Sequence, residues 1–262
     1  MYSTTRIAQL ALALACVLPS VGFAQTVTGE QVIEKMRAVP TPKASAVKLK
    51  MTLLDEKGGK RDVKERTALI LAKDTAEGGA SRLRFESPSD IKGVGLLVLA
   101  RDKGASDQWL YMPALKKTTR IAGAQKKGSF MGTDFTFEDL EPRDPDTGVH
   151  VLLREETMGG QAVWVVESKA KDPASSSYGR VVQWVRKDIS MPVQVEFYDK
   201  TDKLQKLLTA EGIEKIGTYW TARKTTMRDL PKKHSTIMEI VDQKNDIEIP
   251  ESEFTERALS AN

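Results

Sequence analysis

The chain has 262 residues, only 6% of them aromatic, and its formal net charge at pH 7 is +4. This small positive surplus is ordinary for a soluble protein and gives no support to nucleic-acid binding. With one cysteine and two histidines, the sequence excludes an internal disulfide framework and offers few ligands for a metal site.

Residues 1–24 have the layout of a secretory signal peptide. Arg6 is the only charged residue before the apolar run from Ile7 to Leu18, and Gly22-Phe23-Ala24 is a small-residue cleavage site. The run is too short to span a bilayer, so we expect export and cleavage after Ala24. Cys16 leaves lipidation open as an alternative, because the residues before it loosely resemble a lipoprotein cleavage motif; otherwise the mature chain has no cysteine.

The first element expected in the mature chain is an amphipathic helix over residues 28–39. Thr28 and Gln31 have the spacing of a capping box, and Pro40 and Pro42 end the helix. Its apolar stripe consists of Val32, Ile33, Met36 and Val39.

From Ala44 onward the hydrophobic period changes to two, which predicts antiparallel strands joined by short turns. Helical material is expected only in part of Ser89–Leu99, near Phe137–Leu140 and after Pro250. Residues 211–216 fit either a helix or a hairpin, and the hairpin is favoured. The strand candidates are 47–53, 63–73, 81–86, 108–112, 117–121, 149–157, 162–168, 179–186, 193–198, 203–216, 219–228 and 236–242.

These strands predict a mainly β protein with a few helices, in which residues 25–262 form a single domain. A continuous antiparallel sheet of this length twists and curves toward a barrel. With so few aromatic residues and helices to fill the curved sheet, we expect an apolar cavity on its inner face.

The segment GSFMGTDFTFEDL, residues 128–140, is apolar without following the period of a strand or a helix. Its large apolar side chains either plug an ordinary core or form a lid over a ligand cavity. Asp134 and Asp139 either latch such a lid or cap a turn. The apolar residues in question are Phe130, Met131, Phe135, Phe137 and Leu140.

Two further groups of residues have alternative interpretations. Trp109, Tyr111 and Trp184 lie in predicted strands, where they contact the ligand or, more commonly, fill the core. Lys116, Lys117 and Arg120 belong to a basic cluster that contacts a lipid headgroup or a membrane partner, or forms a solvated strand face.

Several segments resemble the LolA-like family, and most closely its branch of outer-membrane lipoprotein-sorting proteins. The segments are PSDIKG at 88–93, WLYMPALKK at 109–117, the stretch 128–140, Tyr198-Asp199-Lys200, and the tail around Phe254 and Leu259. The resemblance implies a half-open β-barrel covered by short helices, with a cavity for acyl chains. It also implies a shuttle role between the inner and outer membranes of a Gram-negative cell.

No thiol, metal or phosphate motif nominates a catalytic centre, so we expect neither an enzyme nor a cofactor. The leading hypothesis is a monomeric periplasmic carrier of a lipid or lipidated protein. Its partners would be an inner-membrane exporter and an outer-membrane acceptor. The alternative is a periplasmic sensor or adaptor of the same fold that docks a membrane protein.

Overall fold

A computed structural model describes residues 27–56, 62–75, 78–101, 106–142 and 144–261. The predicted signal peptide, its cleavage site and Cys16 lie outside this described part of the chain. Among the residues it covers, no helix combines the length and apolar character needed to cross a membrane.

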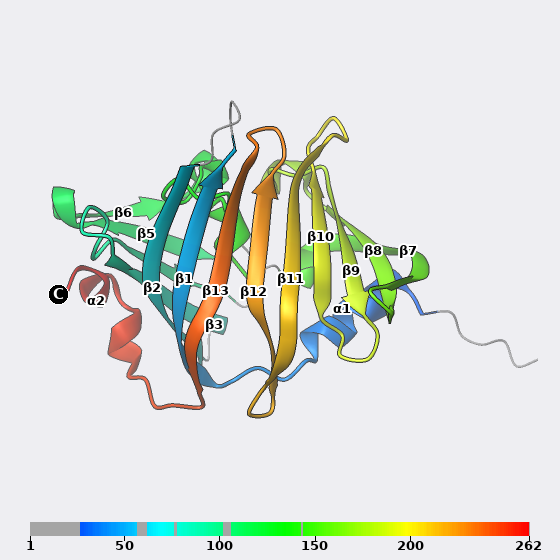
Figure 1. Cartoon of the computed structure of the whole chain (residues 1–262), viewed down its shortest axis with the longest axis horizontal. Helices are drawn as coiled ribbons and strands as arrows, with labels where there is room; N and C mark the ends of the chain where they lie inside the picture. The colour runs from blue at the N-terminus through cyan, green and yellow to red at the C-terminus, as the bar shows by residue number, and fades with distance from the viewer. Residues whose placement is uncertain (1–26, 57–61, 76–77, 102–105, 143, 262) are drawn as a thin grey trace, which may run out of the picture.

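The structure is one antiparallel sheet of 13 strands in the order β6-β5-β4-β3-β2-β1-β13-β12-β11-β10-β9-β8-β7 (Figure 1). The sheet is curved and not closed, which confirms the expected half-open barrel. The strands are β1 (Ala44–Asp55), β2 (Asp62–Thr75), β3 (Gly78–Ser87), β4 (Gly95–Leu99), β5 (Asp107–Met112), β6 (Lys117–Ile121), β7 (Gly148–Met158), β8 (Gln161–Ala170), β9 (Arg180–Arg186), β10 (Pro192–Tyr198), β11 (Leu204–Ile216), β12 (Tyr219–Asp229) and β13 (His234–Asn245).

The regions with a hydrophobic period of two form strands as predicted. One open alternative is resolved, and one expectation is wrong. Residues 211–216 belong to β11, which pairs with β12 and so takes the hairpin alternative. The expected helix within Ser89–Leu99 is wrong: a turn over residues 88–94 leads into β4. Gly93 takes a left-handed φ of 82° in that turn, which a glycine adopts without steric cost.

Strand order determines the path of the segment 128–140. β6 and β7 are consecutive in the sequence but lie at opposite edges of the sheet. The chain between them must therefore cross from one edge to the other. It does so over the concave side, where its aromatic rings contact β1 and β3 at one end and β9 and β10 at the other. We call residues 128–140 the strap, and the sheet face that they contact the inner face.

Short helices cover both faces of the sheet. α1 (Gly29–Arg37) begins with the predicted capping box, in which Thr28 and Gln31 exchange hydrogen bonds. Its Val32 and Ile33 pack on Val185 of β9, which points to the inner face with Val181 by strand alternation.

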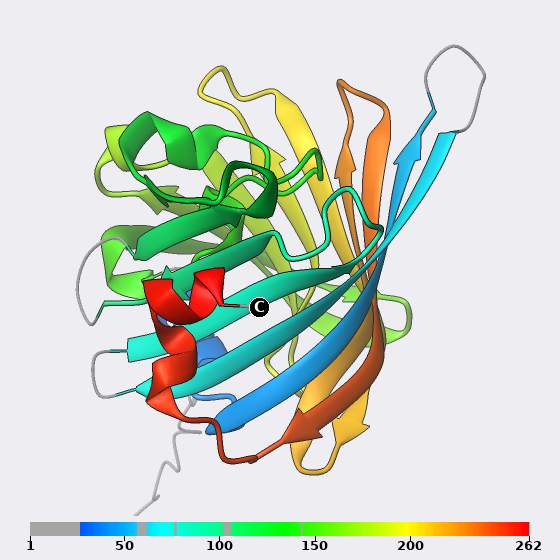
Figure 2. The same ribbon diagram turned by 90° about the vertical axis from the view of Figure 1, so that its left-hand side faces the viewer.

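The C-terminal helical segment covers the other, outer face. The 3₁₀ helix η7 (Glu251–Phe254) and α2 (Glu256–Ser260) pack against β3 to β6 (Figure 2). Their contacts are apolar, since Phe254 and Leu259 cluster with Leu97 of β4. The remaining 3₁₀ helices are η2 (Pro113–Leu115), η3 (Gly123–Lys127), η4 (Glu138–Leu140), η5 (Pro145–Thr147) and η6 (Pro173–Ser175).

Candidate functional site

The strap folds as a tight loop that is closed by its own backbone. Ser129 and Thr136 form an isolated antiparallel bridge, and the Phe130 N–H donates to the Phe135 carbonyl at 2.8 Å. Between them the chain reverses through Met131 (φ 50°) and Gly132 (φ 73°). The Thr133 hydroxyl donates to the Phe130 carbonyl at 2.7 Å, so the loop has a fixed shape.

Two of the strap's rings belong to the core under β1 to β6. Phe130, only 1% exposed, stacks on Phe85 of β3 with a centroid distance of 5.8 Å. Its edge meets Phe137 at 5.6 Å in a T-shaped arrangement. Burial and paired ring geometry of this kind stabilise a fixed position, so this half of the strap has the character of a plug.

The third ring faces the opposite half of the sheet. Phe135 packs in a cluster with Tyr178, Val195, Phe197 and Met227. The strap therefore bridges two apolar clusters instead of belonging to one. Between those clusters it has to span the concave face.

A cavity of about 200 Å³ lies under the strap at the centre of the sheet. Nearly all of its lining is apolar. The strap supplies one wall, and strands β1, β2, β3, β12 and β13 supply the other. The lining residues are Leu49, Met51, Ile70, Leu83, Phe130, Thr133, Phe135, Leu140, Ala222, Thr225, Met238 and Ile240. We call this the inner cavity.

One polar anchor of the strap is Asp134. Its carboxylate is buried, with the residue 4% exposed, and both oxygens lie 2.8 Å from Nδ1 of His234. The Thr236 hydroxyl donates to the same carboxylate at 2.7 Å and accepts from the Asp134 N–H at 3.0 Å. Both partners belong to β13, so this contact fastens the middle of the strap to the middle of the sheet.

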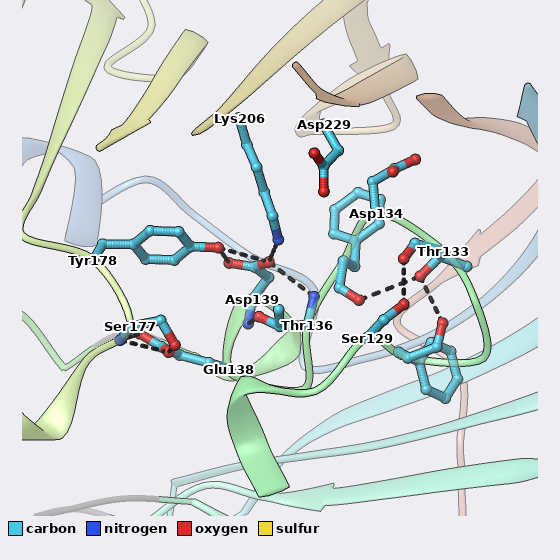
Figure 3. Close-up of polar contacts among 12 residues, drawn as sticks. Ser129, Thr133, Asp134, Thr136, Glu138, Asp139, Ser177, Tyr178, Lys206 and Asp229 are labelled. Carbon is cyan, nitrogen blue, oxygen red and sulfur yellow. Dashed lines mark hydrogen bonds and ion pairs between the residues drawn. The ribbon is translucent and has the colours of Figure 1, made fainter. Parts of the chain in front are cut away.

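The second anchor is Asp139, near the end of the strap (Figure 3). Its carboxylate accepts from Nζ of Lys206 at 2.9 Å and from the Tyr178 hydroxyl at 2.9 Å. It also accepts from the Thr136 N–H at 2.9 Å, while the Asp139 N–H donates to the Thr136 hydroxyl at 3.2 Å, just before the short helix η4. The ion pair is buried, since the side chain of Asp139 is 2% exposed and that of Lys206 is 10% exposed.

Neighbouring contacts support the second anchor. The Glu138 carboxylate accepts from the Ser177 N–H at 2.9 Å and from the Ser176 hydroxyl at 2.5 Å. These serines precede β9, so both acidic residues bind the same side of the half-barrel (Figure 3).

A third contact holds the tip of the strap from β2. Nη1 of Arg66 donates to the Met131 carbonyl at 2.7 Å, and the guanidinium lies 5.7 Å from the centroid of Phe85. Burial lowers the pKa of Arg66, which remains a cation at any physiological pH. None of these four partners, Arg66, Lys206, His234 and Thr236, was expected from the sequence as a site residue. Arg66 and Lys206 shared one local signal, since each is a charged residue on the same strand face as the apolar residue two positions later.

Three aromatic residues nominated for the ligand site lie elsewhere. Trp109 and Tyr111 pack on the outer face with the cluster around Leu97 and Leu259, under the C-terminal segment. Trp184 alternates with Val185 and so points to the outer face of β9, where it packs with Val165. Of the two alternatives for these residues, ligand contact and core filling, their positions correspond to the commoner one, since they fill core on the other side of the sheet.

The nominated basic residues lie on the edge hairpin of β5 and β6. Lys116 occupies the turn with a left-handed φ of 48°, and Lys117 is exposed at the start of β6. Arg120 binds Asp107, as does Arg101, and these two hydrogen bonds lower the pKa of the Asp107 carboxyl. This hairpin is not part of the inner cavity.

The surface of the site that faces the inner cavity is mainly apolar. The described residues contain no group of three or more histidine, cysteine, aspartate or glutamate side chains that could hold a metal ion. The polar side chains at the strap are engaged with each other and with backbone groups, and the surface facing the cavity is aliphatic and aromatic.

Solved structures with the same architecture cover most of this chain. A domain described as an outer membrane lipoprotein-sorting protein, from Vibrio parahaemolyticus, superposes with a TM-score of 0.83 at 28% identity, over 89% of this chain and 98% of that one. A DUF1329 family protein from Desulfovibrio piger gives a TM-score of 0.83 at 29% identity, over 88% of this chain and 97% of that one. A family profile described as "uncharacterized protein" matches residues 79–261.

This chain belongs to the LolA-like family. A LolA superfamily protein from Nitrosomonas europaea shares the fold, with a TM-score of 0.69 at 20% identity over 89% of this chain and 100% of that one. No curated protein matches the chain. The LolA-like fold accounts for the half-open sheet, and the strap lies across its concave face.

Proposed function

We propose that this protein is a periplasmic carrier that binds the acyl chains of a lipid or lipoprotein in its inner cavity. It would accept cargo at the inner membrane and release it to an acceptor at the outer membrane. The observation that carries the proposal is the inner cavity itself: an apolar space under a strap that is fastened to the sheet by polar side chains at three points.

The energetics favour an aliphatic ligand. Each methylene removed from water contributes ~0.8 kcal/mol, so a chain binds tightly without a polar anchor. Met51 and Met238 in the cavity wall suit cargo of varied shape, because their flexible thioethers adapt to different contacts.

The strap's fastening also suits loading and release. The inner cavity of about 200 Å³ is smaller than the ~300–1,000 Å³ of typical ligand sites. A whole lipid therefore enters only if the strap moves away from the sheet. Hydrogen bonds and an ion pair between side chains can exchange with water as the strap lifts, whereas a strap held only by buried rings would expose apolar surface at every step.

Purification without detergent, followed by solvent extraction and mass spectrometry of bound lipid, tests the proposal. We expect co-purifying lipid or, after delipidation, saturable binding of a fluorescent fatty acid. Protein that holds no lipid and binds no acyl probe would overturn the carrier function. A stoichiometric membrane-protein partner whose binding is insensitive to cavity-filling substitutions would then favour the adaptor alternative.

A further inference from the structure

A second cavity, of about 410 Å³, lies where the turn between β11 and β12 approaches the end of α1. In Figure 1 this is the bottom of the sheet. Three segments line it: the end of α1 with the prolines that follow, the turn between β9 and β10, and the start of β12. Its apolar lining includes Met36, Val39, Pro42, Met191, Pro192 and Trp220.

Strand β12 contributes to both cavities. Ala222 and Thr225 line the inner cavity, whereas Trp220 and Thr221 line the second one. The residues at which the two linings meet, Thr221 and Ala222, are consecutive. The two apolar spaces are thus neighbours along a single strand.

The pairing of β12 with β13 is interrupted at this place. The described ladder between them runs from Asp229 and His234 to Lys224 and Glu239 and then ends. Beyond it, the Tyr219 hydroxyl of β12 donates to Asp246, just after β13, at 2.7 Å, and Asn245 at the end of β13 donates to the carbonyl of Ile216, the last residue of β11, at 3.1 Å. Both cavities border this unpaired stretch, where side chains can separate without breaking ladder hydrogen bonds.

We propose that one long acyl chain occupies both cavities, with part of the chain under the strap and the rest beside Trp220. This inference rests on the proposed carrier function and specifies its cargo as a long, unbranched chain. The inner cavity alone is below the usual size of a ligand site, while the second falls within the ~300–1,000 Å³ range. Together they offer the elongated apolar volume that a long chain needs and a short chain does not.

Trp220 provides a direct test, because bromine atoms quench indole fluorescence on contact. The probes are palmitic acids carrying bromines near the carboxyl end, the middle or the methyl end. We expect at least one isomer to quench the delipidated protein, and Trp220→Phe to remove most of that quenching. Trp109→Phe is the matched control, since Trp109 lies on the outer face, and it should leave the quenching in place.

A narrowing variant tests the same inference by affinity. Thr41 is an exposed residue of the second cavity's lining, and Thr41→Phe should weaken binding of a sixteen-carbon fatty acid by about tenfold. Binding of an eight-carbon fatty acid should not change. Thr157→Phe, at an exposed position of edge strand β7, is the control and should affect neither.

The outcomes separate the inference from the carrier function on which it rests. If both fatty acids bind but Trp220→Phe leaves the quenching intact and Thr41→Phe leaves both affinities intact, the second cavity is not part of the ligand site. If no fatty acid binds the wild-type protein, the carrier function fails first. A wild-type dimer that Thr41→Phe dissociates would show a second copy of the chain as the occupant and would also overturn the inference.

Discussion

Asp134 and His234 are 100 residues apart in the sequence, yet the carboxylate of one lies 2.8 Å from Nδ1 of the other. The contact joins the strap to the first residue of β13. With Thr236 on the same carboxylate, it fastens the strap to the middle strand in the order of the sheet. If the strap is a lid, this contact sets how readily it lifts.

Replacement of Asp134 by alanine should destabilise the protein and accelerate uptake of an acyl probe. The Thr236 hydroxyl and His234 would lose their buried partner, at a cost of about 1–3 kcal/mol. Urea unfolding gives the stability, and stopped-flow fluorescence with a fatty-acid probe gives the rate. The control, Asp62→Ala at the exposed start of β2, should change stability by less than about 0.5 kcal/mol. Unchanged uptake in the destabilised variant would contradict a latch role.

Phe135→Asp should abolish lipid uptake while the sheet stays folded. The ring forms part of the cavity wall, and a carboxylate there would meet the acyl chain. Phe254→Asp is a matched control, because both rings are 6% exposed but Phe254 packs on the outer face. Circular dichroism and probe binding distinguish the two variants. Global unfolding by Phe135→Asp would instead assign the strap to the core as a plug.

The pair formed by Lys206 and Asp139 should show strong coupling in a double-mutant cycle. Lys206→Met leaves a buried carboxylate without its cation and should cost about 3–5 kcal/mol. Adding Asp139→Asn should recover part of that loss, with a coupling energy of about 0.5–3 kcal/mol from urea unfolding. The exposed pair of Lys224 and Glu211 is the control cycle, expected at about 0.2–1 kcal/mol. Equal coupling in the two cycles would show that burial does not strengthen the contact.

Glu141, just beyond the strap, should make stability fall as the pH rises. Burial raises its pKa above 4.5, although Nζ of Lys126 lies 2.5 Å away and acts in the opposite direction. A raised folded-state pKa contributes stability that is present below pH 4.5 and lost as the pH rises through the folded value. Glu141→Gln should therefore gain stability relative to the wild type between about pH 4 and 7, by urea unfolding at each pH.

In the matched control for Glu141, the contribution to stability changes with pH in the opposite direction. Lys187 lowers the pKa of exposed Glu155 through a hydrogen bond, so the contribution of Glu155 is present above pH 4.5 and lost at lower pH. Glu155→Gln should lose stability relative to the wild type as the pH rises from acid values toward 4.5, and the difference should be constant at higher pH. If Glu141→Gln also lost stability relative to the wild type as the pH rises, Lys126 would outweigh burial in its effect on the pKa of Glu141.

The strands and the open sheet could be predicted from the sequence because alternation is a local property. The face to which each strand turns its large residues could not. In β5, Leu110 and Met112 contact the inner core while Trp109 and Tyr111 contact the outer one. Both faces of β5 are apolar, because η7 and α2 cover the outer face. These two helices are formed by residues far along the chain from β5. The alternation of β5 therefore left open whether Trp109 and Tyr111 contact a ligand or fill the core, and they fill the outer core.

The strap was recognisable from its composition, but its partners were not. Lys206 lies 67 residues from Asp139, and Thr236 lies 102 residues from Asp134. Contacts at such separations follow from the order of strands in the sheet, which no local pattern specifies. The sequence could therefore indicate a buried loop with acidic residues, but not that those residues fasten it to β11 and β13.

The order of strands also determines when, during folding, the wall of the inner cavity can form. In the described sheet, every pair of neighbouring strands is adjacent in the sequence except β1 and β13. Each half can form one hairpin after another as the chain is produced, but the wall that contains Met51 and Met238 exists only after the last strand pairs with the first. Non-local pairing of this kind is slow, because the chain loses the entropy of closing a long loop before the two strands gain their contacts. A nascent chain that lacks β13 would thus have no complete wall to its inner cavity.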